Sequence, residues 1–564
     1  MSNSDIKKGP TAKDITVDLL IVGSGTGMAA ALAAHEKGLN SLIIEKTDVV
    51  GGSTARSGGA FWIPANPTLL ADGSDDTLEK GKTYLEAITN DSLPDVWKSF
   101  LKNGPDTVDM LLRTTPMEFF WAKGYSDYHP EKPGGDPLGR SCECKPFDLN
   151  RLGDEFDRFR PGQMEAPIPM PVTGYGYKWM NLMLRKPFKS FPIIFKRLFQ
   201  GVGGLLLGKK FDAGGQALAA GLFAGVIDAN IPVWTNTEMV ELISDGERVA
   251  GAIAEQDGKK VKIKAKKGVI LAAGGFDHNM PMRREYQSPS LNQDLSLGAE
   301  GNTGDAITIS KEEINADTAY MNESWWFPSV APLNEDDEVK VMLAERSLPG
   351  SFIVNSSGER FINEATDYMT FGQTLLKREK EGKEMGDMWI IFDQEYRNNY
   401  IFGGSIFPRA PLPDEWYEAG IAYKGETANA LARKVGIPEE NFTSTYERFN
   451  RMAEAGKDED FHRGESAYDR YYGDPTVKPN PNLRPLDGDL YAVKVVLSDL
   501  GTCGGLVADE HGRVLREDKS TIEGLYAIGN TSANIFGRVY PGAGATIAQG
   551  LVYGYIVANH IANS

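Results

Sequence analysis

The sequence predicts an α/β fold in which a nucleotide-binding sheet is built from both ends of the chain around an inserted domain. Near the N-terminus, a strand, a glycine turn, a helix and a second strand that ends in an acid follow one another over residues 17–46. Further apolar strands with glycine turns occur at 266–276 and 522–533, and the nucleotide pattern is absent from about 275 to 488. This gap predicts a second domain inserted into the first.

The composition is that of a folded globular chain of 564 residues, with 41% apolar and 24% charged residues. A net charge of −18 argues against nucleic acid as a partner. The polar N-terminus lacks the apolar core of a signal peptide, and no run of about 18 apolar residues predicts a membrane span. Only three cysteines occur, and no second Cys or His pair stands near Cys142 and Cys144. We therefore expect a cytoplasmic protein without a metal site.

The N-terminal segment is typical of a dinucleotide site. The strand "DLLIV" leads into Gly23-Ser-Gly25 and an alanine-rich helix, and a second strand ends at Glu45. Glycines let the backbone approach a pyrophosphate at the helix N-terminus, and Glu45 falls where a ribose-binding acid belongs. Met28 stands at the expected third glycine and Gly27 lies one residue early, which predicts adjusted helix packing.

A second small-residue loop, Gly51 to Gly59, favours FAD over NAD. Together with the strands at 266–276 and 522–533, this layout resembles the FAD-binding domain of the fumarate reductase and succinate dehydrogenase flavoproteins. The resemblance implies a Rossmann-like FAD-binding domain with an inserted α+β substrate (capping) domain. Since no histidine suits a covalent link, we expect non-covalent FAD. The expected FAD-binding residues are Gly23, Ser24, Gly25, Thr26, Gly27, Met28, Glu45, Lys46, Gly52, Ser53, Thr54, Ser57, Gly58, Gly59, Met239, Ala273, Gly274, Gly529, Asn530, Gly544, Thr546 and Ile547.

The expected domain boundaries follow from the same layout. The FAD-binding domain takes residues 1–287 and 489–564, and the substrate domain takes 288–488. A basic and aromatic insertion over 168–212 interrupts the first part of the FAD-binding domain.

The middle block departs from the fumarate reductases at two points. In that superfamily, a stretch like Arg-Phe-x-Asn-Glu lies in the capping domain and is soon followed by a catalytic arginine. Here "RFINEATDY" places Tyr368 four residues after Glu364. The loop "SDLGTCGG" (498–505) also lacks the histidine that a dicarboxylate site needs. Arginine suits a dicarboxylate, whereas tyrosine suits a neutral substrate.

Five segments are similar to one branch of the superfamily, the 3-ketosteroid Δ1-dehydrogenases, which desaturate C1–C2 of a steroid ring A. They are "GGSTARSGG", "GYSDYHPE", "VLSDLGTCGGLV", "GLYAIGNTSA" and "YPGAGATI". The resemblance implies that the Tyr540 hydroxyl and the Gly544 N–H bind the 3-keto oxygen. A phenol and a helix N-terminal amide suit an oxygen that becomes enolate-like.

The same resemblance implies the remaining catalytic roles. Tyr368 is expected to take the C2 proton with help from Tyr128, while the C1 hydride passes to flavin N5. Because a free phenol has a pKa of about 10, Tyr368 by itself is a poor base at neutral pH. Tyr125 and Trp326 are expected to line the apolar pocket.

The segment 174–210 holds eight basic residues and no acid. Phe188, Phe191, Phe195 and Leu198 recur at helical spacing, and two prolines, at 187 and 192, predict a broken segment. Basic residues interleaved with aromatics predict an interfacial membrane anchor, in preference to an arm that packs on a partner subunit. We therefore expect peripheral attachment to the inner membrane face and a sterol-type substrate with its side chain intact, such as a cholestenone from cholesterol degradation.

Three alternatives remain open at this point. A ketosteroid 4-dehydrogenase or a fumarate-reductase-like ene-reductase could use the same scaffold, and a non-enzymatic flavin-binding or membrane-docking protein is the third. The expected partners are a 3-ketosteroid, an external electron acceptor that is a quinone or a redox protein, and a membrane surface through 174–210. The oligomeric state, the acceptor and the side-chain preference are left undecided.

Overall fold

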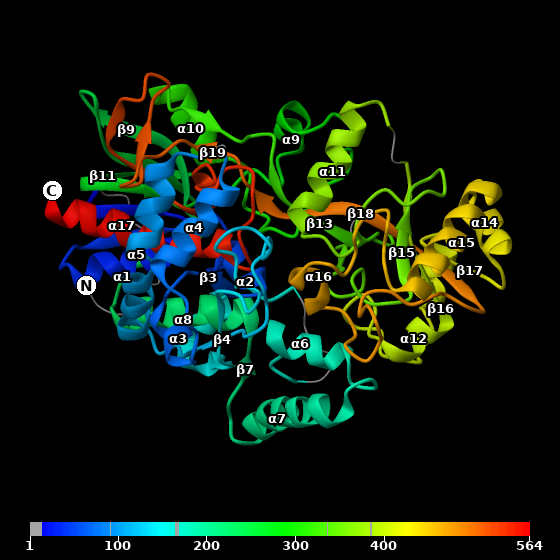
Figure 1. Ribbon diagram of the computed structural model, residues 1–564. Helices are drawn as coiled ribbons and strands as arrows, with labels where there is room; N and C mark the ends of the chain where they lie inside the picture. Colours follow the sequence, from blue (N-terminus) through cyan, green and yellow to red (C-terminus); the bar gives the residue numbers. More distant parts are fainter. Residues whose placement is uncertain (1–13, 91, 164–168, 335–336, 384–385) are drawn as a thin grey trace.

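The computed structural model describes residues 14–90, 92–163, 169–334, 337–383 and 386–564 (Figure 1). A first sheet has the strand order β20-β21-β11-β1-β2-β8. Strand β1 (Ile15–Val22) lies at its centre and pairs in parallel with β2 (Ser41–Ile44) and β11 (Lys259–Leu271). On the far side of β11 follow β21 (Thr521–Ala527) and β20 (Arg513–Leu515), while β8 (Val233–Trp234) closes the other edge. Strands from both ends of the chain therefore share one sheet, as predicted.

Small residues let two helices pack closely beside this sheet. Helix α1 (Gly27–Glu36) follows β1, and the C-terminal helix α17 (Ala545–Asn563) crosses it. A Cβ placed on Gly554 of α17 would lie 2.9 Å from the backbone nitrogen of Ala30 in α1. Because only hydrogen fits at that point, the two helix axes come unusually near each other. This contact brings the start of α17 beside the glycine turn at the end of β1.

A second sheet forms the core of the inserted domain, in the order β14-β13-β18-β16-β15 with β17 also paired to β18. Its central strand is β18 (Leu490–Thr502). The predicted boundary at 488 thus falls just before a strand of the inserted domain, and the chain returns to the first sheet only after Thr502. Helices on this sheet give the predicted α+β domain. Its other strands are β13 (Ser324–Val330), β14 (Lys340–Val341), β15 (Ser351–Val354), β16 (Met388–Asp393) and β17 (Ala422–Gly425).

The remaining elements connect or cover the two sheets. In the first part of the chain they are α2 (Gly52–Arg56), β3 (Ala60–Trp62), α3 (Pro67–Ala71), α4 (Leu78–Ile88), α5 (Pro94–Thr114), β4 (Phe119–Trp121), β5 (Ser141–Cys144), β6 (Phe147–Asp148), η1 (Leu149–Arg158), α6 (Gly174–Asn181), α7 (Pro187–Leu206), β7 (Phe211–Asp212), α8 (Gly214–Asp228), β9 (Glu238–Asp245) and β10 (Arg248–Gln256). Further along they are α9 (Met280–Tyr286), α10 (Asp305–Ile314), β12 (Thr318–Ala319), α11 (Tyr368–Lys380), α12 (Gln394–Asn399), α13 (Asp414–Glu418), α14 (Ala428–Val435), α15 (Glu439–Ala455), α16 (Ala467–Tyr471), β19 (Gly505–Leu506) and η2 (Gly529–Thr531).

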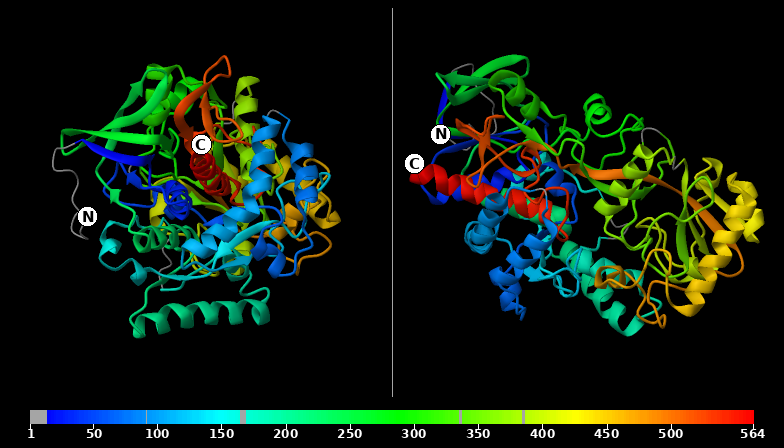
Figure 2. Two further views of the ribbon diagram at one scale, coloured as in Figure 1. Left: turned by 90° about the vertical axis from the view of Figure 1, so that its left-hand side faces the viewer. Right: turned by 45° about the horizontal axis from the view of Figure 1, so that its top comes forward.

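The insertion contains one continuous helix, α7, which lies along one border of the molecule (Figures 1 and 2). As predicted, the segment is not one long helix, because α6 ends at Asn181 and α7 begins at Pro187; a break at Pro192 is not observed, since that proline lies inside α7. Pro187 occupies the first turn, where its missing N–H costs nothing, and Pro192 removes a single intrahelical hydrogen bond. Within the described part of the chain, no helix is long and apolar enough to cross a membrane.

Candidate active site

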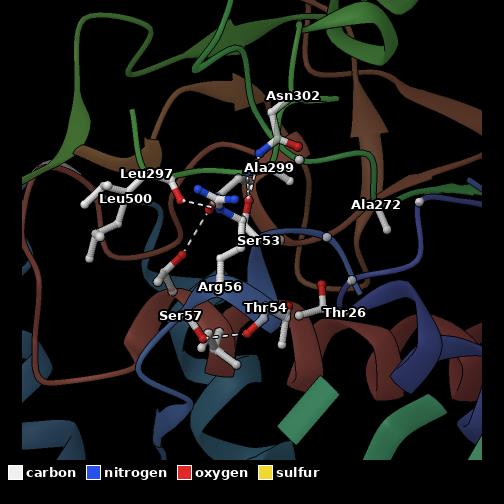
Figure 3. A pocket seen from close by; sticks show the side chains of 18 of the residues that line it. Thr26, Ser53, Thr54, Arg56, Ser57, Ala272, Leu297, Ala299, Asn302 and Leu500 are labelled. Atoms are coloured by element: carbon white, nitrogen blue, oxygen red, sulfur yellow. Dashed lines mark hydrogen bonds between the residues drawn. The ribbon is translucent and has the colours of Figure 1, made fainter. Parts of the chain in front are cut away.

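One cavity is lined by residues of both sheets and of the helices that begin beside them. At one end lie the glycine turn after β1 and the acid after β2; at the other lie aromatic residues of the inserted domain. Figure 3 shows Ser53 of α2 pointing toward Asn302, whose side-chain amide donates to the Ser53 hydroxyl over 2.9 Å. The cavity therefore joins the predicted nucleotide site to the predicted substrate site.

Of the predicted FAD-binding residues, all but two line this cavity. The exceptions are Gly27 and Met28, the first two residues of α1, so any contact they make with the cofactor would come from their backbone N–H groups. Met28 is fully buried in α1, and a Cβ on Gly27 would lie 2.9 Å from the Ile21 side chain. Both residues therefore serve the packing of α1 against β1. The missing third glycine changes that packing and leaves the cavity wall untouched.

The nucleotide end has the donor set and the shape that FAD requires. Gly23 has φ +107°, and a Cβ there would lie 2.1 Å from the Ala272 carbonyl oxygen, so only glycine fits. Helices α1 and α17 both begin at the cavity without a side-chain cap. Their first backbone N–H groups can therefore donate to an anion such as a pyrophosphate. The Glu45 carboxylate accepts from the Ser24 hydroxyl over 2.6 Å and lies at the same turn.

Three buried tyrosines meet near the other end of the cavity: Tyr368 and Tyr540 line it, and Tyr128 contacts both from outside the lining. The hydroxyls of Tyr128 and Tyr368 lie 2.5 Å apart, and the Tyr540 ring is 5.1 Å from that of Tyr128 and 5.5 Å from that of Tyr368. They come from the β4–β5 loop, the first residue of α11 and the loop before α17. The side chain of Asp367 accepts from the Thr370 N–H over 2.9 Å and so places Tyr368 at the start of its helix.

Tyr540 and Gly544 converge on one point at the N-terminus of α17. The Gly544 N–H donates to the Tyr540 hydroxyl over 3.3 Å, and both residues line the cavity. Gly544 has φ +88°, and a Cβ there would lie 2.1 Å from the Ala60 carbonyl oxygen. A glycine is therefore required at this helix start, and its amide can share a ligand oxygen with the phenol.

A buried ion pair holds the loop that carries Tyr128. Asp127 is paired with Arg140, and it accepts from the Trp62 indole over 2.8 Å. The Tyr128 N–H donates to the Pro541 carbonyl over 3.0 Å, which ties this loop to the segment of Tyr540. Burial raises the pKa of Asp127 to about 6, although Arg140 opposes the rise. The carboxylate is thus ionised at neutral pH and keeps the loop in place.

Burial also sets the protonation of the three phenols. It raises the pKa of Tyr128 and of Tyr368 well above the usual value near 10, and the neighbouring tyrosines add to the rise. It raises the pKa of Tyr540 as well, against hydrogen bonds from Tyr368 and Gly544. Neutral Tyr540 is therefore a lasting hydrogen-bond donor, while Tyr368 must lose its proton before it can act as a base.

Tyr125 lines the cavity and stacks on Tyr471 with ring centroids 4.4 Å apart. Trp326 is outside the lining, which corrects that prediction. Neighbouring residues of a strand face opposite sides, so Trp326 packs against Gly372 of α11. Its neighbours face the cavity side: the Trp325 ring is 4.8 Å from Tyr540, and the Phe327 ring is 4.7 Å from Tyr368.

Sequence reasoning missed several apolar residues of the substrate end. Four residues that line the cavity there lie outside every quoted motif: Phe327, Val341, Leu343 and Tyr472. Alternation along "SWWFPSV" could have identified Phe327 once one face of that strand was known. The others carry no local signal, because their approach depends on how the sheet folds over the cavity.

Comparison with known proteins agrees with this geometry. A family model described as an FAD binding domain matches residues 18–547. The chain is 43% identical to the 3-oxosteroid 1-dehydrogenase of Mycolicibacterium smegmatis over 97% of each chain. It is 33% identical to the 4-oxocyclohex-2-ene-1-carboxylate 5-dehydrogenase of Sinomonas cyclohexanicum, over 98% of this chain and 94% of that one. The crystal structure of 3-ketosteroid Δ1-dehydrogenase from Sterolibacterium denitrificans with 1,4-androstadiene-3,17-dione superposes with a TM-score of 0.91 at 35% identity, covering 97% and 99% of the two chains.

Proposed function

Since this chain belongs to the FAD-dependent 3-oxosteroid 1-dehydrogenases, we propose that its three central tyrosines desaturate C1–C2 of a 3-ketosteroid. The protein is an oxidoreductase that acts on a CH–CH bond, and FAD is its cofactor. The glycine turn, Glu45, Ser53, Asn302 and the start of α17 would hold the FAD. When bound, FAD supplies the acceptor for the C1 hydride. The observation that carries the proposal is the convergence of the Tyr540 hydroxyl and the Gly544 amide beside a second pair of phenols.

The first step is polarisation of the ketone. Tyr540 and the Gly544 N–H donate to the 3-keto oxygen, on which negative charge develops as C2 loses its proton. Donors that are already oriented in a buried site stabilise that charge more than they stabilise the neutral carbonyl. Tyr368 takes the C2 proton, and the Tyr128 hydroxyl holds the Tyr368 oxygen in place through their 2.5 Å contact.

The cavity favours a neutral, extended substrate over a small carboxylate. Apolar and aromatic side chains, among them Phe327, Leu343 and Leu500, line its substrate end. Two guanidiniums, those of Arg56 and Arg160, also reach the lining, but both pair with Glu300. A cyclohexanone that bears a carboxylate would need a cation in the cavity that is not already paired with a protein carboxylate. We therefore assign a steroid, as in the relative from Mycolicibacterium smegmatis, and a sterol side chain is the specific expectation.

The experiment that tests this function is anaerobic mixing of the purified holoprotein with 4-androstene-3,17-dione. Flavin bleaching and a 1,4-diene-3-one product are expected. A product desaturated at C4–C5 from a 5α-saturated ketone would instead support a ketosteroid 4-dehydrogenase. Absence of bleaching with every 3-ketosteroid would contradict an enzyme of this class.

We further propose that α7 docks the protein on an anionic membrane surface. Its side chains Phe188, Phe199 and Leu206 are 95%, 81% and 83% exposed, and they recur along one side of the helix. Exposed lysines at 189, 196, 209 and 210 flank them. Arg185, which pairs with Asp474 over 2.7 Å, fastens this segment to the inserted domain. An exposed apolar ridge with a cationic border suits a lipid headgroup region, where a sterol and a quinone acceptor are both found.

A further inference from the structure

The proposed reaction leaves one requirement unmet by the three central tyrosines. Tyr368 can take the C2 proton only as a tyrosinate, and burial raises its pKa well above the usual value. A negative charge in a buried site needs an opposite charge close by. None of the three tyrosines supplies one, so the counter-charge must come from the shell of residues around them.

Arg346 is a buried guanidinium beside that shell. It is 1% exposed, and its Nη1 donates to the Glu364 carbonyl over 2.6 Å and to the Thr366 carbonyl. Its Nε has no partner, and across the described residues it has no carboxylate within 4.0 Å. The nearby Arg360 and Arg463 differ, because each forms an ion pair with Glu364. Arg346 thus forms no ion pair with the described carboxylates, although its charge also acts on Asp469, where it opposes the rise in pKa that burial causes.

The contacts of Arg346 lead directly to the tyrosines. Thr366, which it binds, precedes the base Tyr368 by two residues. The Asn482 amide donates to the carbonyls of Ser347 and Asp469 over 2.8 and 2.6 Å, which joins the Arg346 segment to α16. On α16, the Tyr468 ring lies 4.6 Å from that of Tyr128. The guanidinium therefore binds the turn before Tyr368, and the residue after Arg346 is tied to the helix against Tyr128.

The Arg346 guanidinium acts on two tyrosines whose rings neighbour that of Tyr128, namely Tyr468 and Tyr125. Burial raises the pKa of Tyr468 well above its usual value, and the Arg346 guanidinium opposes the rise. Burial likewise raises the pKa of Tyr125, and Arg346 again acts in the opposite direction. The carboxylates that act on the cluster are Asp367 and Glu143, whereas Asp127 is paired with Arg140 and Asp469 accepts from Asn363 and Gly464.

We propose that Arg346 is a positioning residue that fixes the turn before Tyr368 and supplies the counter-charge for a tyrosinate shared between Tyr368 and Tyr128. This inference rests on the proposed function. In the step it serves, the C2–H bond breaks, an O–H bond forms on Tyr368, and the C–H electron pair enters the enolate. Before the next turnover, that proton leaves through Tyr128 to solvent, which restores the tyrosinate. Arg346 itself exchanges no proton.

The test compares three variants of the holoenzyme. Arg346→Gln removes the charge and keeps an N–H donor, and Arg346→Lys keeps the charge. Arg397→Lys is the matched control, because Arg397 is 2% exposed and also donates only to carbonyls, those of Tyr400, Phe407 and Ala410. Anaerobic flavin reduction by a 3-ketosteroid is followed from mildly acidic to alkaline pH. Tyrosinate absorbance is titrated in parallel without substrate.

Arg346→Gln should reduce flavin at least about ten-fold more slowly at neutral pH, which corresponds to a pKa rise of one unit or more, and should recover as pH rises. In the Arg346→Gln variant, the first tyrosine to ionise should also do so at a higher pH than in the wild type. Arg346→Lys should keep the wild-type pH profile at a lower rate, whereas Arg397→Lys should keep the wild-type rate and the wild-type pH profile.

For Arg346→Gln, a rate that falls equally at every pH, or a tyrosinate titration at the wild-type pH, would overturn the proposal. If Arg346→Gln does not fold, Arg346→Lys decides: a shifted pH profile, or a rate as high as that of Arg397→Lys, would overturn the proposal, and a lower rate with the wild-type profile supports it. Failure of the proposed function is separate: the wild-type flavin would then stay oxidised with every 3-ketosteroid.

Discussion

At the scale of single residues, the site depends on hydroxyl groups whose neighbours decide whether they donate or accept protons. Tyr540 sits beside a backbone amide, and because burial raises its pKa we propose that it stays neutral and donates. Tyr368 sits beside another phenol, and we propose that it ionises and accepts a proton. In this proposal, two chemically identical side chains take opposite roles within one cluster.

Tyr540→Phe should remove one of the two donors to the developing enolate. The loss of one such donor costs about 2.7–4 kcal/mol of barrier, so flavin reduction should fall about 10²–10³-fold. FAD affinity should stay unchanged, because this hydroxyl lies at the substrate end. The control is Tyr472→Phe, which removes another buried hydroxyl from the cavity lining. Equal losses in the two variants would contradict the donor role of Tyr540.

Tyr368→Phe should abolish the pH-dependent part of the reaction. Because burial raises the pKa of Tyr368 above its usual value, its base form grows about ten-fold per pH unit below that pKa, and the wild-type rate should rise with pH. The variant should bind FAD, reduce it orders of magnitude more slowly and show a flat pH profile. A stopped-flow series over pH measures this. A variant that keeps the rising profile would assign the base to another residue.

At the scale of elements, strand alternation and helix starts position the site. Strand β13 presents Trp325 and Phe327 to the tyrosines and turns Trp326 to α11. Helix α17 starts at Gly544 because a side chain there would strike the Ala60 carbonyl. Each element thus brings one type of group to the cavity, an aromatic wall or a backbone donor.

Helix α7 gives a prediction at this scale. The triple variant Phe188→Ser, Phe199→Ser and Leu206→Ser should bind vesicles of anionic lipid at least about 100-fold more weakly, since burying one such side chain contributes roughly 1.5–3 kcal/mol. Vesicle co-sedimentation measures the partition, and activity on a dispersed short-chain ketosteroid should stay unchanged. The control is Phe407→Ser, because Phe407 is an exposed aromatic elsewhere on the surface. Unchanged partition of the triple variant would favour an arm that packs on a partner subunit.

At the scale of the whole molecule, the cavity takes its wall from both sheets, so the cofactor and the two domains stabilise one another. Saturating FAD should raise the free energy of unfolding by about 2.7 kcal/mol at a hundred times its Kd. Thermal unfolding of the apoprotein with and without FAD measures this shift. NAD at the same concentration is the control and should leave the transition in place. An equal shift with NAD would contradict a site built for FAD.

The fold and the site were predictable to different depths. The first sheet and the FAD-binding residues follow from glycine turns and short apolar strands, which are local in sequence. A motif gives positions along the chain and cannot tell that the Met28 side chain packs in the core while its neighbours line the cavity. The continuity of α7 was missed because Pro192 was treated as a break, although one lost hydrogen bond in a long helix leaves the rest intact. The sequence placed the return to the first sheet at 489, but β18 (Leu490–Thr502) still belongs to the inserted domain, because its pairing partners lie far away in the chain.

The sequence by itself determined the cofactor class and the kind of reaction and predicted the tyrosines of the proposed site, because those depend on residue types at short, fixed spacings. Only the tertiary structure decided that Tyr128, Tyr368 and Tyr540 share one buried cluster, that Trp325 replaces Trp326 at its edge and that Arg346 lies behind it. The physical reason is that proximity between segments hundreds of residues apart, and the burial that shifts their pKa values, arise only when the two sheets close around a common cavity.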